Sequence, residues 1–221
     1  MFPKIRRVAV LGAGVMGSGI AAHLANAGIP SLMLDMVPPT LSDEDRKRGL
    51  TEKDPAFRNR FAAKGLAGIR KSRPALLYSQ KDIGLISIGN FDDDLPEAAE
   101  CDWIVEVITE NLAIKKTLYD RIEAVWKPGT VVTSNTSGIA ISQMMEGRTK
   151  EFRRHFLVTH FFNPVRYMKL LELVPGEDTD PGILRGIADF GERKLGKGIV
   201  YGKDTPNFIG NRIGVFAMMY A

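Results

Sequence analysis

A histidine and a glutamate twelve residues apart are the strongest candidates for proton chemistry in this sequence. His160 ends an apolar stretch, and Glu172 lies inside another, where a carboxylate is costly unless it has a partner. If Asn163-Pro164 reverses the chain, two strands bring these side chains together, and the carboxylate then orients the imidazole for general acid–base work. Two alternatives stay open: a packed histidine without a chemical role, and a surface pairing of Glu172 with Lys169 or Arg166.

A glycine-rich segment, Gly12-Ala13-Gly14-Val15-Met16-Gly17, follows an apolar run and opens a helical stretch. Its three glycines permit a tight turn, close approach of the backbone to a pyrophosphate and close helix–strand packing. Free N–H groups of the first helical turn then face the phosphates. Asp35 ends the next apolar run, where a carboxylate accepts hydrogen bonds from both ribose hydroxyls and repels a 2′-phosphate. The pattern predicts NAD; the alternatives are a turn without a ligand and an ordinary strand-end cap.

A polar segment, Ser134-Asn135-Thr136-Ser137-Gly138, follows a third apolar run. Ligands of open α/β sheets bind at the carboxyl ends of the strands, so these side chains are well placed to meet one. A polar turn that caps the next helix is the alternative.

The elements that must position these residues alternate between short apolar runs and helical stretches. That alternation predicts an α/β fold of Rossmann type, a doubly wound and mostly parallel sheet with helices on both faces. The expected strands are Val8–Leu11, Ser31–Asp35, Leu85–Ile88, Trp103–Ile108, Thr130–Ser134, Phe156–Phe162 and Leu170–Val174, and the expected helices are 15–27, 111–126 and 181–194.

Residues 36–82 interrupt the alternation as a polar, basic insertion. Residues 40–82 hold 11 Lys and Arg against 6 Asp and Glu, whereas the rest of the chain holds 19 against 20. Such a basic segment could meet nucleic acid or a small polyphosphate, and the absence of a nucleic-acid motif favours the polyphosphate. Within it, Phe57, Phe61, Leu66 and Ile69 approximate one apolar helix face, and Arg60, Lys64 and Lys71 share another face.

The C-terminal residues predict the start of a second unit. Thr205-Pro206 has the pattern of an N-cap followed by proline at the first helical position, and the apolar helix is still running at Ala221. We therefore expect the helix over 204–221 to be incomplete at Ala221.

Composition excludes several classes of protein. Hydrophobic residues make up 44% and charged residues 25% of the 221, as in ordinary globular proteins. No apolar stretch approaches the roughly 20 residues that span a bilayer, and seven residues precede the first apolar run, so we expect neither a membrane span nor a signal peptide. A single cysteine, Cys101, precludes an internal disulfide and fits a reducing, cytoplasmic compartment. We expect no metal site.

Taken together, these motifs resemble the L-3-hydroxyacyl-CoA dehydrogenases of fatty-acid β-oxidation. The resemblance is poor across 36–82, which looks more like long bacterial fusions that carry an enoyl-CoA hydratase domain. The matching stretches keep the family's order: Gly12–Gly28, Val105–Asn111, Ser134–Gly138, His160–Leu173 and Asp204–Arg212.

The resemblance implies oxidation of (3S)-3-hydroxyacyl-CoA to 3-oxoacyl-CoA with NAD. It makes His160 the general base and Glu172 its orienting partner. The other residues that it implicates are Ser137 and Asn211 at the substrate's 3-oxygen, Asn163 in ordering the site, Glu110 and Lys115 at the nicotinamide end, and, from charge and spacing alone, Arg60, Lys64 and Lys71 at the CoA phosphates.

In this family a C-terminal helical domain closes the acyl pocket and makes the dimer. The resemblance therefore implies an NAD-binding domain over 1–203 and, over 204–221, the first helix of an incomplete helical domain. We therefore expect the 221-residue chain to bind NAD but to turn over slowly or not at all by itself; turnover equal to that of a longer chain would contradict this. Two other functions stay open: a nucleotide-binding module without catalysis, and a dehydrogenase of a free hydroxy acid.

Overall fold

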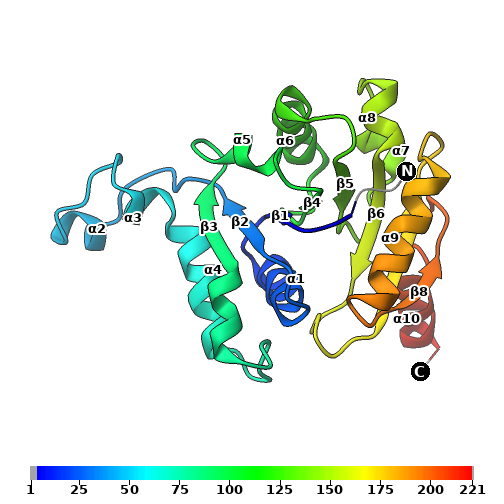
Figure 1. Cartoon of the computed structure of the whole chain (residues 1–221), viewed down its shortest axis with the longest axis horizontal. Helices are drawn as coiled ribbons and strands as arrows, with labels where there is room; N and C mark the ends of the chain where they lie inside the picture. The colour runs from blue at the N-terminus through cyan, green and yellow to red at the C-terminus, as the bar shows by residue number, and fades with distance from the viewer. Residues whose placement is uncertain (1–3, 221) are drawn as a thin grey trace.

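The computed structural model describes residues 4–220 and contains an eight-stranded sheet with the order β3-β2-β1-β4-β5-β6-β7-β8 (Figure 1). Its pairings are parallel except that of β6 with β7, so the predicted mostly parallel sheet is confirmed. β1, β4 and β5 are buried at every residue, which is why apolar residues form all of β1 and the first residues of β4 and β5. The strands are β1 (Val8–Leu11), β2 (Ser31–Asp35), β3 (Ile86–Asn90), β4 (Trp103–Glu106), β5 (Val131–Ser134), β6 (Phe156–Phe161), β7 (Leu170–Pro175) and β8 (Gly198–Tyr201).

Helices cover both faces of the sheet. Successive residues of β1 alternate between two hydrophobic clusters, because neighbouring side chains of a strand point to opposite faces. One cluster packs against α1 (Val15–Asn26), α4 (Arg60–Lys71) and α9 (Pro181–Arg193), and the other against α5 (Leu95–Ala98), α6 (Leu112–Val125), α7 (Ile141–Met144) and α8 (Lys150–Arg154).

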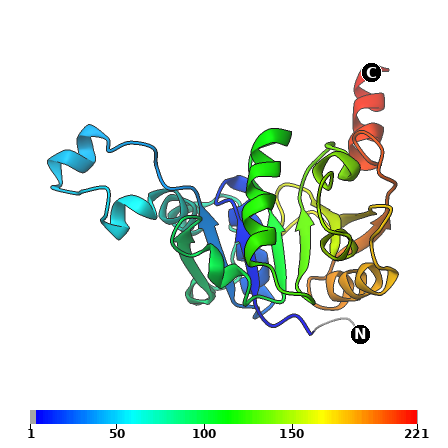
Figure 2. The same cartoon turned by 90° about the horizontal axis from the view of Figure 1, so that it is seen from above.

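The basic insertion contains α2 (Asp43–Lys47), α3 (Pro55–Arg58), α4 and the 3-10 helix η1 (Gln80–Leu85). α2 and α3 lie on an arm that projects from the body, whereas α4 packs against α1 (Figure 2). Of the predicted apolar face, Phe57 and Ile69 are buried and Phe61 and Leu66 are half-buried. The predicted helix therefore exists, with a break between α3 and α4.

The predicted helix start at Thr205-Pro206 is wrong. α10 (Gly210–Met219) begins five residues after Thr205, because Asn207 and Phe208 have left-handed backbone, with φ of 62° and 44°. From there the helix leads away from the sheet (Figure 2). Ala221, at which the helix was expected to be still running, lies outside the described residues.

Other differences are small. β8 was not predicted, β4 ends at Glu106 rather than at Ile108, and Leu85 belongs to η1 rather than to β3. β4 stops early because the Glu106 side chain accepts the N–H of Ile108 and turns the chain away from the sheet. None of the helices within residues 4–220 combines the length and apolar character that crossing a bilayer requires.

Candidate functional site

The histidine and glutamate singled out by the sequence face each other across β6 and β7. His160 lies opposite Glu172 in the antiparallel ladder, and its Nδ1 is 2.6 Å from Oε2 of the carboxylate. Because a carboxylate facing Nδ1 requires the proton on that nitrogen, Nε2 is left free, 3.3 Å from Oγ of Ser137. Glu172 is fully buried and directed at the imidazole, so the alternative surface pairing with Lys169 or Arg166 is wrong.

The second oxygen of Glu172 holds the start of α10. Oε1 accepts the N–H of Ile209 at 3.1 Å and the N–H of Gly210 at 2.6 Å. The imidazole and these two N–H groups together give the buried carboxylate three hydrogen-bond partners in the absence of solvent.

The polar loop after β5 brings Ser137 to the imidazole. Asn135 accepts the N–H of Phe161 through Oδ1 at 2.8 Å, which ties the loop to the strand that carries His160. Glu110 accepts the N–H of Ser137 at 2.8 Å and the hydroxyl of Thr136. Asn135 and Glu110 thus set the position of the hydroxyl that faces Nε2.

A buried polar network lies beneath this loop. Lys115, 1% exposed, places its ammonium 2.6 Å from Oε1 of Glu106 and 3.6 Å from Glu110. The other oxygen of Glu106 accepts the hydroxyls of Tyr119 and Ser134, each at 2.6 Å. Burial, reinforced by the negative charge of Glu106, raises the pKa of Tyr119 well above its usual value, so the phenol stays protonated and donates.

The glycine-rich segment forms the turn between β1 and α1. Gly12 has φ of 118°, and a Cβ at Gly17 would lie 1.8 Å from the carbonyl oxygen of Gly12, so both positions require glycine. At Gly14 a Cβ would meet nothing within 4 Å, so the turn leaves open space. Asp35 reaches back to this turn and accepts the N–H of Ala13 at 2.7 Å.

A cavity of about 530 Å³ opens beside this turn, at the carboxyl ends of β1, β2 and β4. Gly12, Gly14 and Asp35 lie on its edge, and apolar side chains such as Phe91 and Ile108 line the rest. A backbone turn with exposed N–H groups, a carboxylate and an apolar recess fit the pyrophosphate, ribose and base of a dinucleotide, respectively.

The basic candidates of the insertion differ in their surroundings. Lys64 lines a second cavity of about 560 Å³ that also borders Gly14 and Asp35, and Lys71 is exposed. Arg60 instead pairs with the buried carboxylate of Asp45, which offsets its charge. The three predicted CoA contacts are therefore not equivalent.

Two further candidates form no part of the His160–Glu172 pair. Asn163 is exposed in the turn between β6 and β7. Asn211 is half-buried in the first turn of α10, directly after Gly210.

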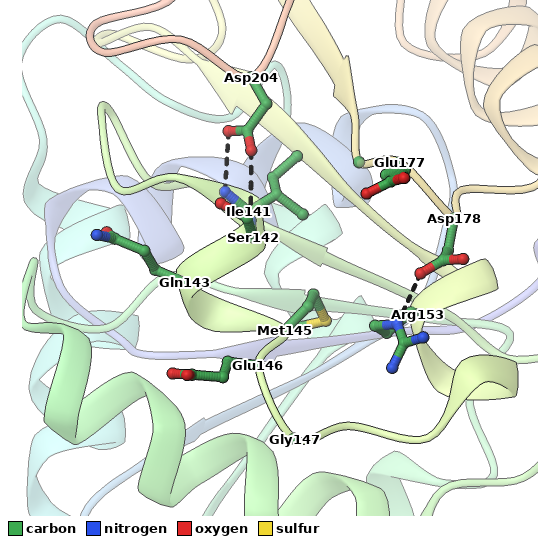
Figure 3. A pocket seen from close by; sticks show the side chains of 11 residues that line it. Ile141, Ser142, Gln143, Met145, Glu146, Gly147, Arg153, Glu177, Asp178 and Asp204 are labelled. Carbon is green, nitrogen blue, oxygen red and sulfur yellow. Dashed lines mark hydrogen bonds and ion pairs between the residues drawn. The ribbon is translucent and has the colours of Figure 1, made fainter.

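A cavity of about 770 Å³ lies elsewhere, between α7, α8 and the end of β7 (Figure 3). Several of its polar groups are already paired: Arg153 donates to Asp178 at 2.7 Å, and Asp204 accepts the N–H groups of Ile141 and Ser142. Over residues 4–220, no three His, Cys, Asp or Glu side chains are grouped to hold a metal ion.

Residues 7–205 match the family described as "3-hydroxyacyl-CoA dehydrogenase, NAD binding domain". The chain belongs to this family. The predicted family resemblance and the predicted NAD cofactor are thereby confirmed.

Curated relatives of this 3-hydroxyacyl-CoA dehydrogenase domain are longer than the chain. A "Probable 3-hydroxyacyl-CoA dehydrogenase" of Bacillus subtilis is 51% identical over 219 residues, which cover 99% of the chain and 28% of that protein. A protein of the same name from Deinococcus radiodurans is 43% identical over 218 residues, which cover 99% of the chain and 59% of that protein. Among solved structures, a 3-hydroxybutyryl-CoA dehydrogenase from Escherichia coli superposes with a TM-score of 0.72 at 27% identity and covers 96% of this chain and 41% of its own.

Sequence reasoning missed the Glu106 network of this NAD-binding domain. Lys115, which was predicted at the nicotinamide end together with Glu110, belongs to this network, and its buried ammonium contacts Glu106 and Glu110. The rule that singled out Glu172, a carboxylate inside an apolar strand, applies equally to Glu106 in β4. Ser134 was part of the polar segment singled out by the sequence, whereas Tyr119 had no comparable signal, since it is one of several apolar and aromatic residues of α6.

Proposed function

We propose that the protein containing this chain oxidises (3S)-3-hydroxyacyl-CoA to 3-oxoacyl-CoA with NAD. The observation that carries the proposal is the buried His160–Glu172 pair, whose free Nε2 faces Ser137 at the edge of the sheet where the dinucleotide turn lies. The names of the relatives support the same reaction.

In this proposal His160 is the general base. Nε2 takes the proton of the substrate's 3-hydroxyl, while Glu172 keeps the Nδ1 proton in place and stabilises the imidazolium that forms. Ser137 and Asn211 hydrogen-bond the 3-oxygen and hold the reacting carbon in position, and Asn163 orders the adjacent turn. NAD, when bound, supplies the acceptor for the hydride that leaves C3.

In this proposal the NAD-binding site consists of the turn Gly12–Gly17, which binds the pyrophosphate, and Asp35, which binds the adenine ribose. Each carboxylate oxygen of Asp35 accepts one backbone N–H, from Ala13 or Met36, and retains a lone pair for a ribose hydroxyl. Glu110 and Asn135 border the nicotinamide end, with Lys115 acting from beneath through Glu110.

Replacing Asp35 by asparagine is expected to weaken NAD binding about ten- to a hundredfold, because charge-assisted hydrogen bonds to the ribose are lost. NADP binding should weaken less, since the repulsion of its 2′-phosphate disappears. Isothermal titration with both nucleotides measures this, with Asp43→Asn, an exposed carboxylate of α2, as the control. An unchanged dissociation constant for NAD in Asp35→Asn would remove Asp35 from the site.

The substrate in this proposal is a thioester of CoA, whose phosphates meet Lys64 and Lys71, with Arg60 contributing less because of Asp45. We expect the reverse reaction to consume NADH at 340 nm with acetoacetyl-CoA, to ignore free acetoacetate, and to be inhibited by free CoA. Consumption with the free acid and no effect of CoA would indicate a hydroxy-acid dehydrogenase. No consumption in a longer chain that binds NAD would indicate a binding module.

We also propose that residues 1–203 form the NAD-binding domain and that α10 begins a helical domain through which the protein dimerises. α10 exposes large apolar side chains, including Ile213 at 65% and Phe216 at 63%. Two relatives from Rickettsia named "Putative fatty acid oxidation complex trifunctional enzyme" support further enzymatic domains beside this one, and we propose that one of them is an enoyl-CoA hydratase domain. The single, buried and free Cys101 supports a cytoplasmic location.

A further inference from the structure

The turn that precedes α10 has an unusual backbone. Asn207 and Phe208 are consecutive non-glycine residues with positive φ, 62° and 44°. For a bulky residue such as phenylalanine this conformation is rare, and it persists only where the surrounding structure holds it. The contacts of Phe208 and its neighbours therefore indicate what this turn does.

Those contacts converge on the catalytic pair of the proposed function. The Phe208 ring is 1% exposed, and its centroid lies 5.9 Å from that of the His160 imidazole. The next two N–H groups, of Ile209 and Gly210, both point at Oε1 of Glu172. One short turn thus contacts the imidazole and restrains the carboxylate oxygen that the imidazole does not use.

Gly210 is the position of the turn at which a side chain would clash with its surroundings. A Cβ there would lie 2.8 Å from Cζ of Phe162 and 3.5 Å from Oε1 of Glu172. Phe162 packs on the imidazole with ring centroids 4.4 Å apart. A side chain at residue 210 must therefore displace the Phe162 ring from His160 or move the N–H donors away from Glu172.

We propose that the turn Asn207–Gly210 is a positioning element for the His160–Glu172 pair, and that Gly210 is the residue on which its fit depends. The turn acts at two points. Its N–H groups fix the rotation of the Glu172 carboxylate, and Phe208, together with Phe162, fixes the plane of the imidazole. Its kinetic consequence rests on the proposed function, whereas its structural consequence for the histidine ring does not.

Gly210→Ala and Gly214→Ala test the proposal as a matched pair. Both add one methyl group to α10, but a Cβ at Gly214 meets nothing within 4 Å, and alanine favours a helix at either position. The chain has three histidines, so 15N-labelled imidazoles give few signals to assign, and their shifts report which nitrogen carries the proton. Spectra are recorded at about pH 9, where an ordinary imidazole is neutral.

In the unsubstituted chain and in Gly214→Ala we expect His160 to carry its proton on Nδ1 alone. In Gly210→Ala we expect shifted ring signals with a share of the proton on Nε2, and kcat lowered about tenfold or more with little change in KM. Identical His160 signals in Gly210→Ala and Gly214→Ala would overturn the proposal. If the unsubstituted protein has no dehydrogenase activity, the proposed function fails, and the ring spectra still decide the role of the turn.

If Gly210→Ala does not fold, a second variant, Phe208→Leu, tests the same proposal. It retains an apolar side chain and the backbone N–H donors but removes the ring beside the imidazole. We expect altered His160 ring shifts, with the His23 and His155 signals unchanged. Unaltered His160 shifts in Phe208→Leu would contradict the proposed contact.

Discussion

Replacing His160 by alanine is expected to slow the reduction of acetoacetyl-CoA by about 10²- to 10⁴-fold, the usual contribution of a positioned acid–base group. In the reverse direction the imidazolium gives its proton to the 3-oxygen. Glu110 is not expected to replace it, since its carboxylate already accepts the hydroxyl of Thr136 and the N–H of Ser137. The rate of NADH loss at 340 nm measures the effect, in a chain length for which the unsubstituted protein turns over.

His155→Ala is the matched control for this experiment. His155 lies at the other end of β6, where its Nδ1 is 2.9 Å from the carbonyl oxygen of Glu151. Its loss should leave the rate unchanged, and NAD should bind His160→Ala with wild-type affinity, because His160 is not part of the glycine-rich turn. A His160→Ala rate within tenfold of wild type would assign the chemistry to another group.

The parts of the site that could be predicted are those determined by local sequence. The turn Gly12–Gly17 has a glycine pattern that few other structures need, and β1 and β2 have the predicted bounds. The pairing of His160 with Glu172 was predictable because a carboxylate in an apolar run needs a partner, and the chain offers few. In each case the residue type is unfavourable at its position unless one specific structural role or contact exists for it.

The parts that could not be predicted depend on residues far apart in the sequence. Thr205-Pro206 has correct local signals for a helix start, yet α10 begins at Gly210, where Glu172, 38 residues earlier, accepts the first free N–H. The spacing of Arg60 in the sequence predicted an unpaired cation, but Asp45 of α2 forms an ion pair with it and offsets its charge. Local propensity cannot reveal either partner.

Replacing Glu172 by glutamine is expected to change which nitrogen of His160 carries the ring proton while keeping the hydrogen bonds to α10. Oε1 faces two backbone N–H donors, from Ile209 and Gly210, so the amide must turn its oxygen toward them and its NH₂ toward His160. The NH₂ group can only donate, so Nδ1 must become the acceptor and the ring proton moves to Nε2, the atom that has to take the substrate's proton. Turnover should fall about 10³- to 10⁴-fold, as when the carboxylate of a Ser-His-Asp triad becomes an amide.

Stability should change far less than turnover in Glu172→Gln, because the hydrogen bonds that hold α10 are kept. The urea midpoint of unfolding measures stability, and ring 15N shifts report the tautomer directly. Glu177→Gln, an exposed residue just after the same strand, is the control and should alter neither quantity. If Glu172→Gln retained both the Nδ1 proton and turnover within tenfold of wild type, the carboxylate would be a structural anchor for α10, and the orientation of His160 would depend on Phe162, Phe208 and Ser137.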